Sequence, residues 1–198
     1  DGSIPNTNSF TYDEPILIDS TTVIRARTFA NNSLPSEIVS CTYIINQNHN
    51  LPIISIATEP DFLFDPDVGI YVKGTNGTIL HGDWGSRDDL FDPFIWDDNE
   101  LRIANFFQNW ERPVSLEYFD VNGNQIFKSQ AGVKIHGGWS RLHPQKSLSV
   151  HFRDIYGTEN MNYQIFSDKS ILSFNTFMLR NSGSDWIESM FRDGLVQS

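Results

Sequence analysis

The chain has 198 residues, of which 39% are hydrophobic and 13% aromatic, so it can bury the core of one ordinary domain or of a small domain joined to a larger one. Its 25 acidic residues outnumber 14 basic ones, and the net charge of −11 argues against a nucleic-acid partner and an anionic membrane surface. The only cysteine, Cys41, excludes an internal disulfide and a metal site built from several cysteines.

The hydropathy and the ends of the chain set further limits. No apolar run approaches the roughly 20 residues that a membrane span needs, so we expect no membrane insertion. The sequence has neither an initiator methionine nor a signal peptide. We therefore expect it to be a piece of a longer protein, with neighbouring domains on both sides.

Residues 1–46 have the pattern of a small all-β module. An apolar run at residues 15–18, an alternating segment at 22–29 and a third segment at 37–45 are separated by clusters of turn-forming residues. Several short strands at this spacing are typical of a β-sandwich. Nothing in this module suggests chemistry, and the polar residues 46–50 are the expected linker.

The second unit, residues 47–198, predicts an antiparallel sheet with a helix packed on it. The Asn122-Gly123 pair is a strong signal for a hairpin turn. A helix is expected from Trp186, with Asp185 as its N-cap. The length and phenylalanine content of the last predicted strand favour a central position in the sheet. We expect strands at residues 51–57, 68–73, 113–119, 125–136 and 171–180.

Residues 74–109 look like an insertion, because glycines, aspartates and aromatics follow one another without a sheet period. Only residues 99–108 predict a helix there. The aromatic side chains form either a ligand surface, such as a platform for a sugar, or an apolar cluster that orders a long loop, and the length of the loop favours the cluster. They are Trp84, Phe91, Phe94, Trp96 and Phe107.

The most informative stretch is residues 130–152, which predicts a hairpin with a long, glycine-containing connection. Apolar and polar residues alternate on both sides of the connection. Lys146 has the same phase as Leu148 and Val150, so its ammonium is expected on the apolar face of the sheet. An ammonium in such a place needs an anionic partner.

Other residues of the connection would suit a phosphate as this partner. Gly137 and Gly138 let backbone N–H groups approach phosphate oxygens, and Arg141 adds a forked donor. Taken alone, however, two glycines and a lysine favour an ordinary hairpin loop. The histidines of the hairpin lack the spacing of a metal site, so we predict none; they are His136, His143 and His151.

A series of motifs runs in order through the second unit. They are Gly69-Ile70-Tyr71-Val72, Trp110-Glu111-Arg112-Pro113, Gly132-Val133-Lys134-Ile135-His136-Gly137-Gly138, Pro144-Gln145-Lys146-Ser147, Leu179-Arg180-Asn181 and Arg192-Asp193. By their order and spacing, residues 51–198 resemble the first part of a CotH-type kinase domain, from the family of spore coat protein H-like and secreted atypical kinases.

This resemblance implies an α+β fold with a protein-kinase-like small lobe, incomplete in this chain. It implies that the intact parent is a transferase of the bacterial cell surface or exterior. That parent would move the γ-phosphate of ATP, with Mg²⁺ or Mn²⁺, to Ser or Thr hydroxyls of a surface or coat protein. The site residues that it implies are Lys146, which would hold the phosphates, Gly137, Gly138 and Arg141, which would line the loop, and Asp193, which would help to position Lys146. The catalytic aspartates of such kinases follow the small lobe, so we expect no catalytic residue and no tightly bound cofactor in this chain.

The N-terminal module carries a resemblance of its own. Asp1-Gly2-Ser3, Pro15-Ile16 and residues 21–27 resemble the later strands of the Fn3-like module that follows chitobiase and β-hexosaminidase catalytic domains. The resemblance implies a partial Fn3/Ig-like spacer with an open edge. A second hypothesis for the whole chain follows from it, a non-catalytic binding or adhesion module of the cell surface that uses Trp84 and Trp96 to bind a glycan.

Two charged residues outside the hairpin loop also need partners. Glu117 lies on the polar phase of its strand, which indicates a cross-strand charge pair. Arg180 extends from an apolar strand, and we expect its guanidinium to meet an inward carboxylate, either Asp185 or Asp193.

Overall fold

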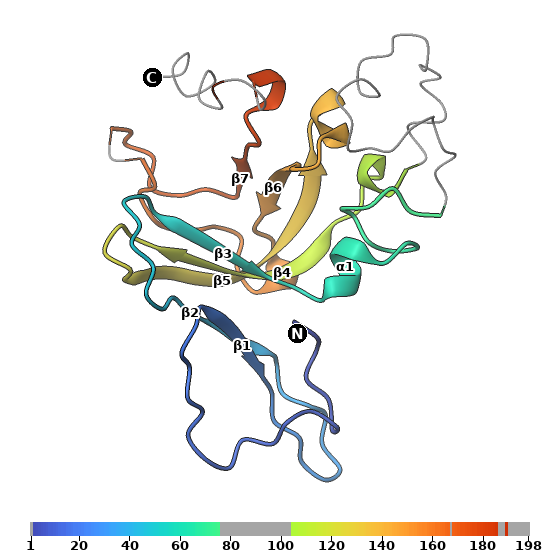
Figure 1. Ribbon diagram of the computed structural model, residues 1–198, viewed down its shortest axis with the longest axis vertical. Coiled ribbons are helices and arrows are strands. Elements are labelled where there is room, and N and C mark those ends of the chain that lie inside the picture. Colours follow the sequence, from blue (N-terminus) through green and yellow to red (C-terminus); the bar gives the residue numbers. More distant parts are fainter. Residues whose placement is uncertain (1, 76–103, 167, 186–188, 190–198) are drawn as a thin grey trace.

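The computed structural model of the chain describes residues 2–75, 104–166, 168–185 and 189 (Figure 1). This part of the chain forms a two-stranded antiparallel sheet, β1-β2, and a five-stranded antiparallel sheet in the order β3-β4-β5-β6-β7. The strands are β1 (Thr22–Ala26), β2 (Val39–Tyr43), β3 (Ile53–Ala57), β4 (Arg112–Phe119), β5 (Gln125–His136), β6 (Ser147–His151) and β7 (Thr176–Leu179). The helical elements of the described residues are one short α-helix, α1 (Pro60–Phe64), and 3₁₀ turns at Asn105–Phe107, Trp139–Leu142, Asp154–Tyr156 and Gly183–Asp185. The prediction of antiparallel sheet preceded by an all-β module is confirmed.

The small sheet forms within two of the segments predicted as strands, residues 22–29 and 37–45. β1 pairs with β2 so that Val23 lies opposite Thr42, and Figure 1 shows this pair, in blue, below the larger sheet. The apolar run at residues 15–18 is not a strand, and the Leu17 side chain is 89% exposed. The described part of the first module is therefore a two-stranded ribbon with long irregular segments, in which only Thr22–Ala26 and Val39–Tyr43 pair as strands.

The β4-β5 hairpin turns at the predicted Asn-Gly pair. The Asp120 carboxylate accepts hydrogen bonds from the backbone N–H groups of Asn122 (2.9 Å) and Asn124 (2.8 Å). Gly123 has a φ of +80°, a left-handed conformation that glycine adopts without a Cβ penalty. The turn chemistry in the sequence therefore fixes the register of this hairpin.

Residues 68–73 do not form the predicted strand. The segment instead folds back on α1, where Ile70 N–H donates to Phe62 O (2.9 Å) and Tyr71 N–H donates to Leu63 O (2.8 Å). A one-turn helix leaves its last carbonyl groups without intrahelical partners, and this segment satisfies them. Its apolar character serves burial, because Ile70 is only 1% exposed.

The strand predicted at residues 171–180 is shorter than expected and is not central. β7 pairs with β6 alone among the described strands and lies at the edge of the sheet. One of its faces is packed, since the Phe177 ring lies 6.0 Å from the Phe152 ring, whereas Met178 is 50% exposed. Arg180 follows β7 and is exposed, and Asp193, one of the two carboxylates expected to meet its guanidinium, lies outside the described residues, so that pairing stays a prediction.

Several predictions fall outside the described residues. The aromatic residues Trp84, Phe91, Phe94 and Trp96, the helix from Trp186 and Asp193 are among them. Of the helix predicted at residues 99–108, the described part has one 3₁₀ turn at Asn105–Phe107, flanked by extended backbone at Ala104 and Gln108. The Asn105 amide explains this local shape, because its Nδ2 donates to Pro66 O and Gly69 O, both at 3.0 Å.

The core of the second unit lies on one face of the five-stranded sheet. Apolar side chains at alternate positions of β4, β5 and β6 are buried, and segments from outside the sheet cover them. The strand residues are Val114, Leu116, Val133, Ile135 and Val150, and the covering residues include Ile70, Phe106, Leu142 and Met161. None of the helices in the described ranges has the length and apolarity to cross a membrane.

The two sheets meet at a buried carboxylate, Glu117 of β4, which is 1% exposed. Its Oε2 accepts a hydrogen bond from Thr42 Oγ1 of β2 at 2.5 Å, and its Oε1 accepts one from Gln125 Nε2. Lys128, opposite Glu117 on β5, lies 3.9 Å away and forms the cross-strand charge pair, whose partner the sequence did not identify. The pair is confirmed, while the burial arises because the N-terminal module covers this face of the sheet.

Candidate functional site

The β5-β6 loop, residues 137–146, is an ordered structure closed by the sheet at its base. His136 at the end of β5 pairs with Ser147 at the start of β6. Gly137 has a φ of +113°, and a Cβ atom there would collide with Ser140 Oγ. Glycine is therefore required at this position by the backbone alone. Figure 1 shows the 3₁₀ turn Trp139–Leu142 of this loop above β5.

Arg141 ties the loop to the 3₁₀ turn at Asn105–Phe107. Its Nε donates to Gly137 O at 2.5 Å, and its Nη1 donates to Phe106 O and Phe107 O, each at 3.2 Å. The guanidinium carbon lies 5.7 Å from the centre of the Phe107 ring. These contacts make Arg141 a brace between two loops, and two of its three nitrogens are already used by backbone carbonyls.

Lys146 points into the molecule, as its phase in the sequence predicts, and is 9% exposed. Its Nζ donates to Arg141 O at 2.6 Å and to His143 O at 3.0 Å. The same nitrogen lies 4.3 Å from the centre of the Phe106 ring and 5.5 Å from that of Tyr71. Its partners are therefore carbonyl dipoles and aromatic faces, which hold an ammonium without neutralising it.

The charge of Lys146 is the unusual property of this site. Burial lowers the pKa of Lys146 from its ordinary 10.5 to about 8, so most of the ammonium is still protonated at neutral pH. Within the part of the chain that the structure describes, no carboxylate lies at ion-pair distance from it. An ammonium has three N–H donors, and the two carbonyl contacts use two of them. One N–H donor of the ammonium is therefore left without a carbonyl partner among the described residues.

Asn181, which sequence reasoning did not single out, fastens both ends of the loop to the end of β7. Its amide Nδ2 donates to Gln145 O at 2.6 Å and to Ser140 O at 3.4 Å. Its Oδ1 accepts from Ser147 Oγ at 2.8 Å and from Gly183 N–H at 3.0 Å. The side chain is 3% exposed with these contacts satisfied. The one available signal was its place in the Leu179-Arg180-Asn181 motif.

A second polar cluster surrounds Glu111, before β4. Its carboxylate accepts from Arg153 Nε (3.0 Å) and Tyr156 Oη (2.9 Å), and Lys134 Nζ lies 3.4 Å away. Burial raises the pKa of Glu111, but the hydrogen bonds from Arg153 and Tyr156 outweigh this, so the pKa lies below its usual value. Lys134 of β5 and Arg153, which follows β6, both pair with this carboxylate, so the cluster links the start of β4 to the neighbouring parts of the sheet.

The histidines of the hairpin do not converge. His136 is exposed, and His151 contacts Ser149 Oγ (3.0 Å) and Thr176 Oγ1 (3.2 Å). In the described residues, no group of three His, Cys, Asp or Glu side chains has a geometry that could hold a metal ion.

The structure thus brings four of the predicted site residues, Gly137, Gly138, Arg141 and Lys146, into one loop. Gly138 has open space where a Cβ atom would lie. Asp193, the fifth, lies outside the described residues. Whether these groups bind a nucleotide stays a prediction.

Comparison with known proteins gives two partial matches. Residues 133–198 match the family model of the CotH kinase protein, and residues 1–43 match the family model named Fn3 associated. Residues 51–132, which the motifs also assigned to the CotH family, lie outside the first match. No curated protein and no solved structure matches the chain. The chain is therefore similar to Fn3-associated sequences over its first sheet and to CotH kinase proteins from the end of β5 through the Lys146 loop to residue 198.

Proposed function

We propose that this chain is the nucleotide-facing part of a CotH-like protein kinase of the bacterial cell surface or exterior, with Lys146 holding phosphate groups of ATP. The observation that carries the proposal is the buried, positively charged Lys146, which has only carbonyl and aromatic partners in the described residues. The match of residues 133–198 to the CotH kinase protein family supports it.

The physical argument rests on the missing countercharge. Burying an ammonium beside carbonyls and rings costs free energy that an ion pair would offset, and the lowered pKa of Lys146 reflects this cost. A phosphate oxygen that accepts the third N–H would supply the countercharge. The net charge of −11 opposes the approach of ATP, and a bridging Mg²⁺ or Mn²⁺ would reduce that repulsion.

The other loop residues take different parts in this proposal. Arg141 holds the loop in shape through Gly137 O and the carbonyls near Phe106, and Lys146 provides the charge. Gly138 has open space where a Cβ atom would lie, which would let a phosphate approach the backbone there. The phosphoryl group would pass from ATP to a Ser or Thr hydroxyl of a surface or coat protein, with the base supplied by the large lobe of the kinase fold.

The test compares phosphate incorporation from radiolabelled ATP by the full-length protein in its wild-type, Lys146→Met and Lys169→Met forms. Lys169 is the matched control, since it is 53% exposed and pairs with Asp168 at 2.9 Å. We expect Lys146→Met to lose at least tenfold of the incorporation, the effect of removing one charge-assisted contact of about 1.5 to 3 kcal/mol, and Lys169→Met to be unchanged. Equal incorporation in all three forms would remove Lys146 from the mechanism.

The rival proposal is a non-catalytic module of the cell surface, and the Fn3-associated match at residues 1–43 favours it. A full-length wild-type protein that incorporates no phosphate with either Mg²⁺ or Mn²⁺ would support this rival.

A further inference from the structure

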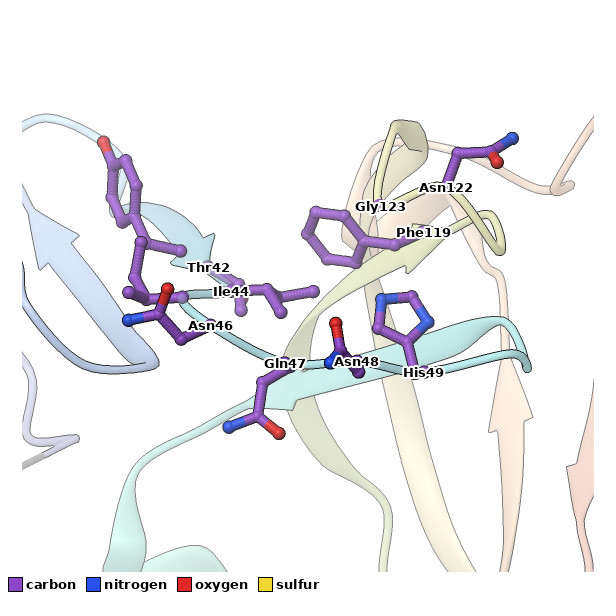
Figure 2. A pocket seen from close by; sticks show the side chains of 11 residues that line it. Thr42, Ile44, Asn46, Gln47, Asn48, His49, Phe119, Asn122 and Gly123 are labelled. Carbon is purple, nitrogen blue, oxygen red and sulfur yellow. The ribbon is translucent and has the colours of Figure 1, made fainter.

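The junction between the two sheets contains a pocket that is separate from the Lys146 loop. Its volume is about 570 Å³, and it is lined by residues 42–49, from the end of β2 through the linker, and by Phe119, Asn122 and Gly123 of the β4-β5 hairpin. Figure 2 shows the linker on one side of this space and Phe119 of the hairpin on the other, with the His49 ring directed toward Phe119 and the Gln47 side chain directed away from it. A pocket of this size is in the range of about 300 to 1,000 Å³ that small-molecule sites occupy.

The lining is polar without being charged. Among the described residues, no Asp, Glu, Lys or Arg lines the pocket, although the whole chain carries a net charge of −11. Asn46, Gln47 and Asn48 present three amides, which make no side-chain hydrogen bond to the rest of the described chain. Each amide offers a donor and an acceptor side by side. The lining therefore selects for neutral groups that donate and accept at once, and hydroxyls are such groups.

His49 adds an acceptor of defined orientation. Its Nδ1 lies 2.8 Å from Leu51 O, and because a carbonyl only accepts, Nδ1 carries the proton in this contact. Nε2 of a neutral imidazole is then an acceptor. Tyr43, which is 43% exposed, adds an aromatic face that can stack against the apolar side of a sugar ring.

The walls of the pocket are held in place before any ligand arrives. Thr21 Oγ1 accepts from Ile45 N–H at 3.1 Å, which fixes the start of the linker. Asn46 has a φ of +54°, a bend that sets the direction of the linker. The opposite wall is the hairpin turn that the Asp120 carboxylate closes. A ligand would therefore lose little affinity to ordering of the protein.

We propose that this pocket binds a neutral carbohydrate. A phosphate or a carboxylate finds no cation among the lining residues, and a cation finds no carboxylate. A purely apolar ligand would form no hydrogen bond with the three linker amides. The site does not depend on the nucleotide role of Lys146, because no residue of the β5-β6 loop lines it.

The test is an NMR titration of the ¹⁵N-labelled chain with three neutral trisaccharides, maltotriose, cellotriose and triacetylchitotriose, and separately with inorganic phosphate. We expect at least one trisaccharide to shift the amide resonances of residues 43–49, and phosphate to leave them unchanged. The double variant Gln47→Ala/Asn48→Ala should bind that trisaccharide about tenfold more weakly, from two lost hydrogen bonds. Asn8→Ala is the control, since Asn8 is an exposed amide outside the pocket and its loss should not alter binding.

Three results would overturn the proposal: no shift with any trisaccharide, shifts that avoid residues 43–49, or equal affinity of the double variant and the wild type. Phosphate that shifts the same resonances as strongly as the sugars would also overturn it. Gln47 and Asn48 are exposed, so the variant is expected to fold, and its amide spectrum away from the pocket provides the check.

Discussion

Removing the Glu117 carboxylate should uncouple the N-terminal module from the larger sheet. In Glu117→Ala the Thr42 hydroxyl and the Gln125 amide lose their acceptor, and Lys128 loses its ion-pair partner. Breaking a buried pair on one side costs about 3 to 5 kcal/mol. We expect the lower end, about 3 kcal/mol of unfolding free energy, because the Lys128 side chain is 30% exposed and can turn to water.

A double-mutant cycle measures how much of this energy crosses between the modules. Thr42→Val removes one hydrogen bond to a charged group and should cost about 2 kcal/mol. The Thr42→Val/Glu117→Ala variant should be less destabilised than the sum of the single variants by about 1.5 kcal/mol, because both remove the same contact. Thr28→Val, which changes an exposed hydroxyl of the same module, should add to Glu117→Ala without coupling.

Urea unfolding at equilibrium, followed by the fluorescence of the five tryptophans and by circular dichroism, gives the four free energies. The reasoning is refuted if Thr42→Val and Glu117→Ala are additive within about 0.5 kcal/mol, since the 2.5 Å contact would then carry no energy between the modules.

Three further predictions concern the sheet and its loop. The pKa of Lys146 is about 8 in the folded chain and 10.5 ordinarily, so the unfolded state binds more protons than the folded state between pH 8 and 10.5. The unfolding free energy of the wild type should therefore rise by up to about 3 kcal/mol relative to that of Lys146→Met over this pH range, as measured by urea titrations. A constant difference would contradict the burial of a charged Lys146. Asn181→Ala should cost about 2 to 3 kcal/mol in urea unfolding, because Ser147 and the Gln145 carbonyl lose buried partners; a loss under 0.5 kcal/mol would show that the amide is dispensable. The pKa of Glu111 is lower in the folded chain than its ordinary value of 4.5, so the carboxylate contributes its full stabilisation above pH 4.5 and loses it as pH falls through the folded pKa. In acid unfolding, the unfolding free energies of wild type and Glu111→Gln should converge over that range. A constant difference between them would refute the assignment.

The sequence predicts the hairpins well because their signals are local. The Asn122-Gly123 pair and the alternation on either side specify the β4-β5 hairpin, and the same alternation places Lys146 on the inner face of the sheet. At residues 68–73 and 171–180, apolar residues led to the prediction of a strand and of a central strand, because the sequence does not show which neighbouring strands are available. The first segment satisfies the carbonyls of α1, and the second has only one neighbouring strand.

In the candidate site, too, the sequence predicts local features but not long-range contacts. The inward direction of Lys146 follows from a two-residue period, whereas its carbonyl partners depend on how the loop closes, and no period encodes that. The bracing role of Asn181 and the burial of Glu117 arise from residues that are far apart in the chain. Contacts of this kind are visible only once the sheets are assembled.

The central claim is that the Lys146 ammonium binds phosphate groups, and calorimetric titration tests it most directly. The wild-type chain and Lys146→Met are titrated with ATP in Mg²⁺ and, separately, with adenosine, which lacks phosphates. The account predicts that the substitution weakens ATP binding at least tenfold, the effect of one lost charge-assisted contact, and leaves any adenosine binding unchanged. ATP affinity that is equal in the two forms would contradict it.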